Sequence, residues 1–231
     1  MHLKVRDAAE LLGVSSKAIS RWIEEKEIPV HYVDGQYRFE HAELLEFAIQ
    51  QGLQPSPLLV KAMQAQDSAT VSECLVNGGI HYRVGGGTKR EVLETALQMI
   101  QGVEQTAAGP LLEMFLARES LASTGIGDGI AIPHTRTPLL GYVSRPMLSL
   151  AFLETPIDYE ALDGKPVQAL FLLVSPTIRS HLAILGRLSF ALKDHLFRQA
   201  VLRRETRQKI LSSLRAIEAR IPDTMNISHT H

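Results

Sequence analysis

One histidine in this sequence follows a backbone pattern that would present its side chain rigidly. His134 comes after a stretch in which Gly125, Gly127 and Gly129 alternate with other residues, and Pro133 directly precedes it. Glycine allows a backbone path that other residues rarely take, and the proline ring fixes the chain just before the histidine. Imidazole has a pKa of about 6.5, so one ring nitrogen can act as a nucleophile while a carbonyl holds the other. The pattern is therefore compatible with nucleophilic chemistry at His134, and by itself it does not distinguish that role from a structural one.

A longer motif surrounds this histidine. Residues 116–134, with the sequence LARESLASTGIGDGIAIPH, resemble the active-site signature of the fructose, mannitol and nitrogen class of phosphotransferase-system IIA domains. Three further blocks match the same family in the right order, at residues 162–167, 171–176 and 181–188. The resemblance spans residues 70–217. It implies an α/β fold in which a mixed sheet is covered by helices on both faces.

The resemblance also implies a role for individual side chains. His134 would accept a phosphoryl group from the phosphohistidine of the carrier protein HPr or of its nitrogen-branch relative. His181 would be the second active-site histidine, and Arg118 would balance the charge of the phosphate. Such a transfer depends on in-line positioning and on donors around the phosphoryl oxygens. The family uses no metal and no cofactor, and Thr135 replaces its usual small residue, so we expect crowding of the donor there.

A metal site is the competing interpretation of the two histidines. His134 and His181 would need a third ligand, and no Cys, His or carboxylate cluster in the sequence has a recognised metal-binding spacing. The glycine-rich residues 85–89 lack the residue order of a phosphate-binding P-loop, so we expect a turn. Cys74 is the single cysteine of the chain, and we expect it to be a small buried apolar side chain.

The first 51 residues predict a small separate domain. Apolar residues at helical spacing in 7–12, a glycine stop at Gly13 and a serine cap at Ser15 or Ser16 indicate two helices joined by a tight turn. Two short β-rich segments then flank the dipeptide at 34–35, Asp-Gly, which is typical of a type I′ hairpin. A third helix is expected from residue 41 to residue 51.

Three segments of this domain resemble MerR-type and excisionase-type winged-helix DNA-binding domains. They are residues 5–15 (VRDAAELLGVS), 21–25 (RWIEE) and 37–39 (YRF). In such a domain the second helix of the helix-turn-helix enters the major groove, and the hairpin forms a wing beside the DNA backbone. The candidate DNA-contacting residues are Lys17, Ser20, Arg21 and Arg38.

The overall charge of this domain limits how it could bind DNA. Residues 1–57 carry six basic and nine acidic residues, a net charge of −3. If one copy neutralised about three phosphates, its affinity would fall about 40-fold between about 50 and about 200 mM salt. We therefore expect a homodimer that binds two half-sites. The alternative is a small helical module used for protein contacts.

Length and composition predict a folded protein of two parts. The chain has 231 residues, of which 45% are hydrophobic and 21% are charged. We expect a MerR/excisionase-like domain, a linker, a IIA-type phosphoacceptor domain and a flexible tail, with bounds at 1–51, 52–69, 70–217 and 218–231. Buried strands are predicted at 129–132, 147–153 and 167–174. No apolar run reaches the roughly 18 residues of a membrane span and no signal peptide is evident, which favours a cytoplasmic protein without membrane insertion.

Together these patterns favour a transcriptional regulator of the phosphotransferase system. Phosphorylation of His134 would add about −1.5 to −2 charge and so change DNA occupancy. The alternative is a phosphocarrier, a protein-histidine phosphotransferase that passes its phosphoryl group to a IIB domain of a sugar transporter. HPr or its relative and DNA are the expected partners in the first case, and a IIB domain is a further partner in the second.

Overall fold

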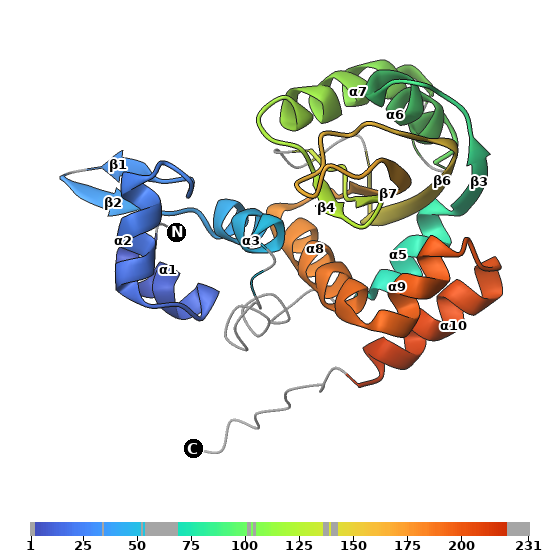
Figure 1. Cartoon of the computed structure of the whole chain (residues 1–231). Helices are drawn as coiled ribbons and strands as arrows, with labels where there is room; N and C mark the ends of the chain where they lie inside the picture. Colours follow the sequence, from blue (N-terminus) through green and yellow to red (C-terminus); the bar gives the residue numbers. More distant parts are fainter. Residues whose placement is uncertain are drawn as a thin grey trace.

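The computed structural model describes residues 3–33, 35–51, 53, 69–100, 103, 105–135, 139 and 143–220. Its N-terminal part (Figure 1) contains the elements α1 (Val5–Leu12), α2 (Ser16–Glu24), β1 (His31–Val33), β2 (Gln36–Arg38) and α3 (His41–Gln50). Three predicted features lie wholly or mostly outside the described residues: Asp34 of the hairpin turn, the linker at 52 and 54–68, and the tail at 221–231.

The turn between α1 and α2 follows from local residue chemistry. Gly13 has φ of 67°, a left-handed conformation that glycine adopts without side-chain strain. The Ser15 hydroxyl then accepts a hydrogen bond from the Ala18 backbone N–H and begins α2. Trp22 is buried on the inner face of α2 and packs edge-on against Phe47 of α3, with ring centroids 5.1 Å apart. The predicted helix-turn-helix is confirmed, and α3 forms part of its core.

The C-terminal part is built around one five-stranded sheet. Its elements are α5 (Val71–Gly78), β3 (Ile80–Val84), α6 (Lys89–Gln98), α7 (Gln105–Glu119), β4 (Gly125–Gly127), β5 (Ile130–Ala131), β6 (Met147–Ile157), β7 (Val167–Val174), α8 (Ile178–Lys193), α9 (His195–Leu202) and α10 (Arg207–Glu218). The strand order is β3-β6-β7-β5-β4. The pairs β3–β6 and β5–β7 are parallel, whereas β6–β7 and β4–β5 are antiparallel. The sheet is therefore mixed, as predicted.

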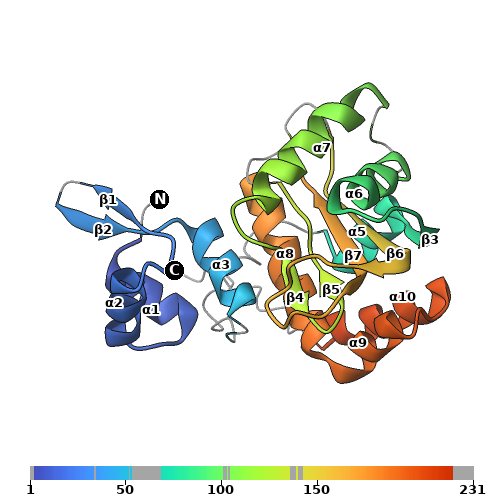
Figure 2. The same ribbon diagram turned by 45° about the horizontal axis from the view of Figure 1, so that its top comes forward.

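Helices cover both faces of this sheet (Figure 2). Phe171 and Leu173 of β7 pack into a core shared with α5, α8, α9 and α10, whereas Leu170 and Leu172 pack into a second core with α6 and α7. Successive side chains of a strand point to opposite faces, so a strand covered on both sides must be apolar throughout. This explains the unbroken apolar run at 169–174 and confirms the predicted fold class.

Helix α3 connects the two parts of the molecule. It lies against α8 and β4, and both views show it beside α8 (Figures 1 and 2). Four of its side chains belong to the same continuous hydrophobic core as α8: Leu44, Leu45, Phe47 and Ala48. At the end of α8, Lys193 Nζ donates a hydrogen bond of 3.0 Å to the Leu53 carbonyl, and burial lowers the pKa of Lys193.

Cys74 and the glycine-rich residues 85–88 have the structures that the sequence indicates. Cys74 lies in α5 and is fully buried. Residues 85–88 form a bend that leads into α6, and the Thr88 hydroxyl accepts a hydrogen bond from the Glu91 backbone at the start of that helix.

Within the described ranges, no helix combines the length and the apolar character needed to cross a bilayer.

Gly78 provides a test of how tightly α5 packs on the sheet. A Cβ at this position would lie 2.4 Å from the Leu148 carbonyl oxygen, so we expect Gly78→Ala to destabilise the C-terminal part by about 1–3 kcal/mol. The midpoint of thermal unfolding, followed by circular dichroism, measures this effect. Gly85→Ala is the matched control, because no atom of the described residues lies within 4 Å of a Cβ there. Equal midpoints for the two variants would contradict the packing described.

Candidate functional site

His134 is held at the end of β5 by the backbone around it. The residue forms a parallel bridge with Leu173 of β7, and the Leu173 N–H donates to the Pro133 carbonyl at 2.9 Å. Its ring Nδ1 lies 2.7 Å from the Ile132 carbonyl oxygen. A carbonyl oxygen only accepts, so Nδ1 carries a proton and the lone pair of the neutral ring is on Nε2. The geometry thus makes Nε2 the nucleophilic nitrogen of His134.

His181 lies beside this ring, in the first turn of α8. The Thr177 hydroxyl caps the helix by accepting a hydrogen bond from the Ser180 backbone. The ring centroids of His134 and His181 are 5.2 Å apart, with a 55° angle between the ring planes. The two predicted histidines are therefore brought together. In the part of the chain that the structure describes, no group of three or more His, Cys, Asp or Glu side chains is arranged to hold a metal ion.

Ser175 is a site residue that the sequence analysis did not single out. It directly follows β7, it is 2% exposed, and its hydroxyl shares a hydrogen bond of 3.2 Å with His181 Nδ1. This bond holds the His181 ring in one orientation toward His134. The sequence could have identified it, because Ser175 is a polar residue at the end of an otherwise apolar buried strand. Such a residue needs a hydrogen-bond partner inside the protein.

Arg118 and Glu119 end α7 and hold the chain that leads to β4. Arg118 Nη1 donates to the Ala122 carbonyl at 2.9 Å. The Glu119 carboxylate accepts from the Thr124 backbone N–H at 2.9 Å and from the Thr124 hydroxyl at 2.6 Å. Because β4 pairs with β5, these bonds stabilise the segment that precedes His134. The role of Arg118 in balancing a phosphate charge stays a prediction.

Both imidazoles are nearly buried. His134 is 4% exposed and His181 is 8% exposed, and the neighbouring Thr135 is also buried. Helix α8 carries His181, and β4 pairs with the strand that leads to His134; both elements also contact α3. A protein that reacts with His134 Nε2 therefore needs a local opening of this face first. Crowding of such a donor by Thr135 stays a prediction.

The predicted DNA-contacting residues lie at accessible positions in the N-terminal part. Lys17, Ser20 and Arg21 are exposed on α2, and Arg38 is half-buried at the end of β2. Arg21 Nε lies 3.5 Å from a carboxylate oxygen of Glu25, and both side chains are largely exposed. An exposed ion pair of this kind contributes little to stability, so Arg21 can exchange its partner for a phosphate. Contact of these four residues with DNA stays a prediction.

The hairpin also carries an exposed aromatic pair. Tyr32 and Tyr37 are cross-strand partners, 69% and 43% exposed, and their rings meet edge to face with centroids 5.2 Å apart. The sequence analysis did not identify this pair. The sequence nevertheless indicates the pair, because Tyr32 and Tyr37 are equally far from the turn at 34–35 and are therefore expected to face each other across the hairpin. A hydrogen bond of 2.8 Å between His31 Nε2 and Glu43 Oε2 connects the hairpin to α3.

Comparisons with known families match the two parts separately. Residues 75–217 match the family described as phosphoenolpyruvate-dependent sugar phosphotransferase system, EIIA 2. Residues 3–52 match a family of helix-turn-helix domains, which leaves the MerR or excisionase type a prediction.

Three similar proteins illustrate the extent of the match. A nitrogen regulatory protein of Pseudomonas aeruginosa is 36% identical over 122 residues, which cover 52% of this chain and 77% of that protein. A fructose-specific EIIA component from Haloferax volcanii is 38% identical over 101 residues, which cover 43% of this chain and 64% of that protein. The crystal structure of the nitrogen regulatory protein IIA-Ntr from Neisseria meningitidis has a TM-score of 0.54 and 27% identity, and covers 62% of this chain and 98% of that one.

The hydrogen bond to Ile132 predicts the tautomer of His134. At a pH where the ring is neutral, ¹⁵N NMR of histidine-labelled protein is expected to show a protonated Nδ1 and an unprotonated Nε2. The resonances of the His134 ring are identified as those that are missing from the spectrum of the His134→Gln variant. A neutral His134 ring with its proton on Nε2 would contradict the geometry and would leave the wrong nitrogen available for reaction.

Proposed function

This chain belongs to the EIIA 2 family of the phosphoenolpyruvate-dependent sugar phosphotransferase system, and on that premise we propose that it is a regulator. His134 accepts a phosphoryl group, and the helix-turn-helix domain responds with altered DNA binding. The observation that carries the proposal is the His134–His181 pair, with centroids 5.2 Å apart and the first ring fixed through Nδ1. The proposed partners, a phosphohistidine protein and DNA, assign the protein to the cytoplasm.

The proposed reaction needs no group beyond those of the two proteins. The lone pair of His134 Nε2 attacks the phosphorus of a phosphohistidine on HPr or its nitrogen-branch relative. The Nε2–P bond forms as the donor's P–N bond breaks, and the electron pair of the broken bond returns to the donor imidazole. Such a transfer proceeds through a loose transition state, in which positioning and charge stabilisation matter more than covalent assistance. The bond from Nδ1 to the Ile132 carbonyl supports this step, because it keeps the attacking lone pair on Nε2.

The electrostatics beside His134 favour a phosphoryl group. His181 lies in the first turn of α8, and the N-terminal end of a helix carries a partial positive charge that favours anions. Its ring, oriented by Ser175, is proposed to donate a hydrogen bond from Nε2 to a phosphoryl oxygen. Arg118 is proposed to balance the remaining charge once the face opens. His181 therefore acts on the transferring group, whereas Ser175 acts through His181 as a positioning residue.

The contacts of α3 suggest how phosphorylation reaches the DNA-binding part. Helix α3 packs on α8 and β4, and the same helix is bonded to the hairpin through Glu43 and His31. A phosphoryl group brings about −1.5 to −2 charge to a face whose two imidazoles are nearly buried. Buried charge is costly unless it is paired or hydrated, so this face must loosen. We propose that loosening shifts α3, and with it the hairpin and α2.

The phosphoacceptor role predicts a specific loss of transfer. Incubated with enzyme I, HPr and phosphoenolpyruvate, the wild type is expected to gain one acid-labile phosphate, seen by mass spectrometry, and His134→Ala to gain none. His181→Ala is expected to accept phosphate about 10²- to 10³-fold more slowly, the effect of losing one transition-state donor. His195→Ala, at an exposed histidine of α9, is the control and keeps the wild-type rate. Undiminished labelling of His134→Ala would reject the assignment.

The regulatory role predicts that phosphorylation changes DNA affinity. On a duplex selected from a random library by the unphosphorylated protein, we expect the Kd to change about fivefold or more after phosphorylation, the size of a typical coupling. His134→Ala given the same treatment should keep its starting Kd, and Arg21→Gln should bind weakly in both states. Sedimentation of the protein–DNA complex tests the expected homodimer. An identical Kd for both forms of the wild type would exclude the switch.

A second candidate function is supported by one of the similar proteins. The relative from Haloferax volcanii is described as a fructose-specific EIIA component of the phosphotransferase system. In this case the chain would be a phosphocarrier for a IIB domain. Radiolabel that moves from His134 to a IIB cysteine would favour the carrier, whereas label that stays on this chain would favour the regulator.

A further inference from the structure

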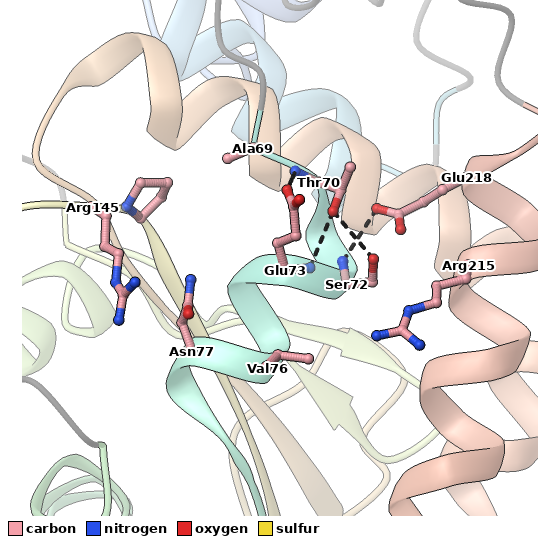
Figure 3. Close-up of a pocket in the computed structure, with 10 residues that line it drawn as sticks. Ala69, Thr70, Ser72, Glu73, Val76, Asn77, Arg145, Arg215 and Glu218 are labelled. Carbon is pink, nitrogen blue, oxygen red and sulfur yellow. Dashed lines mark hydrogen bonds between the residues drawn. The ribbon is translucent and has the colours of Figure 1, made fainter.

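A pocket lies on the face of α5 (Figure 3), and neither His134 nor His181 is among the residues that line it. Its volume is about 910 Å³, and its walls are α5, the last turn of α10 and the residues directly before β6. Pockets that bind small molecules in proteins have volumes of about 300–1,000 Å³. Neither the phosphoryl transfer nor the DNA contacts proposed above use this pocket.

Two arginines enter the pocket from opposite sides of α5. Arg145 comes two residues before β6, Arg215 lies on α10, and Figure 3 shows α5 between their side chains. Arg145 and Arg215 are both exposed. Within the described part of the chain, neither guanidinium has a hydrogen-bond or ion-pair partner. A guanidinium group is a rigid planar fork of donors that matches the two oxygens of a carboxylate or a phosphate.

The two carboxylates that line the pocket are engaged with the start of α5. Glu218 Oε1 accepts hydrogen bonds from the Val71 N–H at 2.6 Å and from the Ser72 N–H at 3.2 Å. Glu73 Oε2 accepts from the Thr70 N–H at 2.8 Å, and the bonds to Thr70 lower the pKa of Glu73. Both negative charges thus lie at the positive end of the α5 dipole. They stabilise the helix instead of pairing with the arginines.

The surface between the arginines is suited to the middle of a small molecule. Asn77 offers an amide that can both donate and accept, and Val76 offers an apolar side chain that is 56% exposed. Both residues are on α5, which both arginines flank. The lining therefore favours a ligand with an anionic group at each end and a short carbon or sugar skeleton between them.

We propose that this pocket binds a small organic molecule with two anionic groups, one held by Arg145 and the other by Arg215; such a molecule is termed a dianion below, whatever the charge of each group. Dicarboxylates and sugar bisphosphates share this chemistry. The ligand would contact three elements that are distant in sequence, namely α5, α10 and the start of β6. The pocket also lies at the same end of the sheet as the reactive histidine. Met147 of β6 pairs with Val174, and His134 forms a bridge with the adjacent Leu173.

Isothermal titration calorimetry on the full chain tests the proposal. The probes are glutarate and fructose 1,6-bisphosphate, with acetate and inorganic phosphate as the corresponding single anions. We expect one of the dianions to bind about tenfold or more tightly than its single-anion counterpart, because it gains a second charge-assisted contact. Whether glutarate or the bisphosphate binds distinguishes a carboxylate site from a phosphate site.

Variants at exposed arginines locate the binding. Arg145→Gln and Arg215→Gln are each expected to weaken the preferred dianion about tenfold, while both keep the wild-type thermal midpoint. Arg83→Gln is the matched control, since Arg83 is an exposed arginine outside the pocket that pairs with Glu154, and it should bind as the wild type does. The proposal is overturned if neither dianion binds at millimolar concentration, or if the two pocket variants bind as tightly as the control. Because His134 is unchanged in these variants, their labelling by HPr separates this outcome from the phosphoacceptor assignment.

Discussion

The parallel pairing of β5 with β7 determines most of the geometry at the histidine pair. Its register continues past β5, so that His134 comes opposite Leu173 of β7. Strand β7 then ends, Ser175 follows, and α8 begins three residues later with His181 in its first turn. One strand therefore positions both rings, His134 by pairing and His181 by continuation of the chain. A register slip of one residue would turn the His134 side chain to the opposite face of the sheet, because side chains alternate along a strand.

The same arrangement makes the site rigid and poorly accessible. The backbone at His134 is held by its bridge to Leu173 and the ring by its bond to the Ile132 carbonyl, and the residue is 4% exposed. A fixed nucleophile lowers the entropic cost of reaching an in-line geometry. A nucleophile that is nearly buried can be reached by a protein donor only after the surrounding structure has opened. Helix α3 contacts β4 and also α8, the helix that carries His181, so the helix-turn-helix domain packs against elements that build the site.

The sequence predicted those helices and strands whose residue pattern is set by a single physical requirement, such as burial or helix capping. Strand β7 could be predicted because burial on both faces demands an apolar run, and α2 because Ser15 and Gly13 mark its start and the preceding stop. Strand β3 was not predicted, since its middle residues, His81 to Arg83, are polar or partly exposed and its pairing with β6 is visible only in three dimensions. Helix α5 was missed as well, because Asn77 and two glycines at its end are typical of a turn.

Two features of the site depended on contacts that no local pattern encodes. The hydrogen bond between Ser175 and His181 joins a residue that precedes α8 to one within its first turn, and the sequence does not indicate that the two side chains are partners. The packing of α3 on α8 could not be predicted from the sequence either. Leu44, Leu45 and Ala48 have the spacing expected for the core of a small domain, and that spacing does not reveal a second partner. The predicted association of His134 with His181, in contrast, came from the resemblance of two separate blocks, residues 116–134 and 181–188, to one family, and the two rings do lie side by side in the fold.

The central claim is that Nε2 of His134 forms the bond to phosphorus. ³¹P NMR of the chain after transfer from phosphorylated HPr, with His134 labelled with ¹⁵N, measures this bond through the coupling between phosphorus and one ring nitrogen. The account predicts an acid-labile phosphoramidate coupled to Nε2, while Nδ1 keeps its proton. A phosphoramidate on Nδ1, or an acid-stable ester on a serine or threonine, would contradict it.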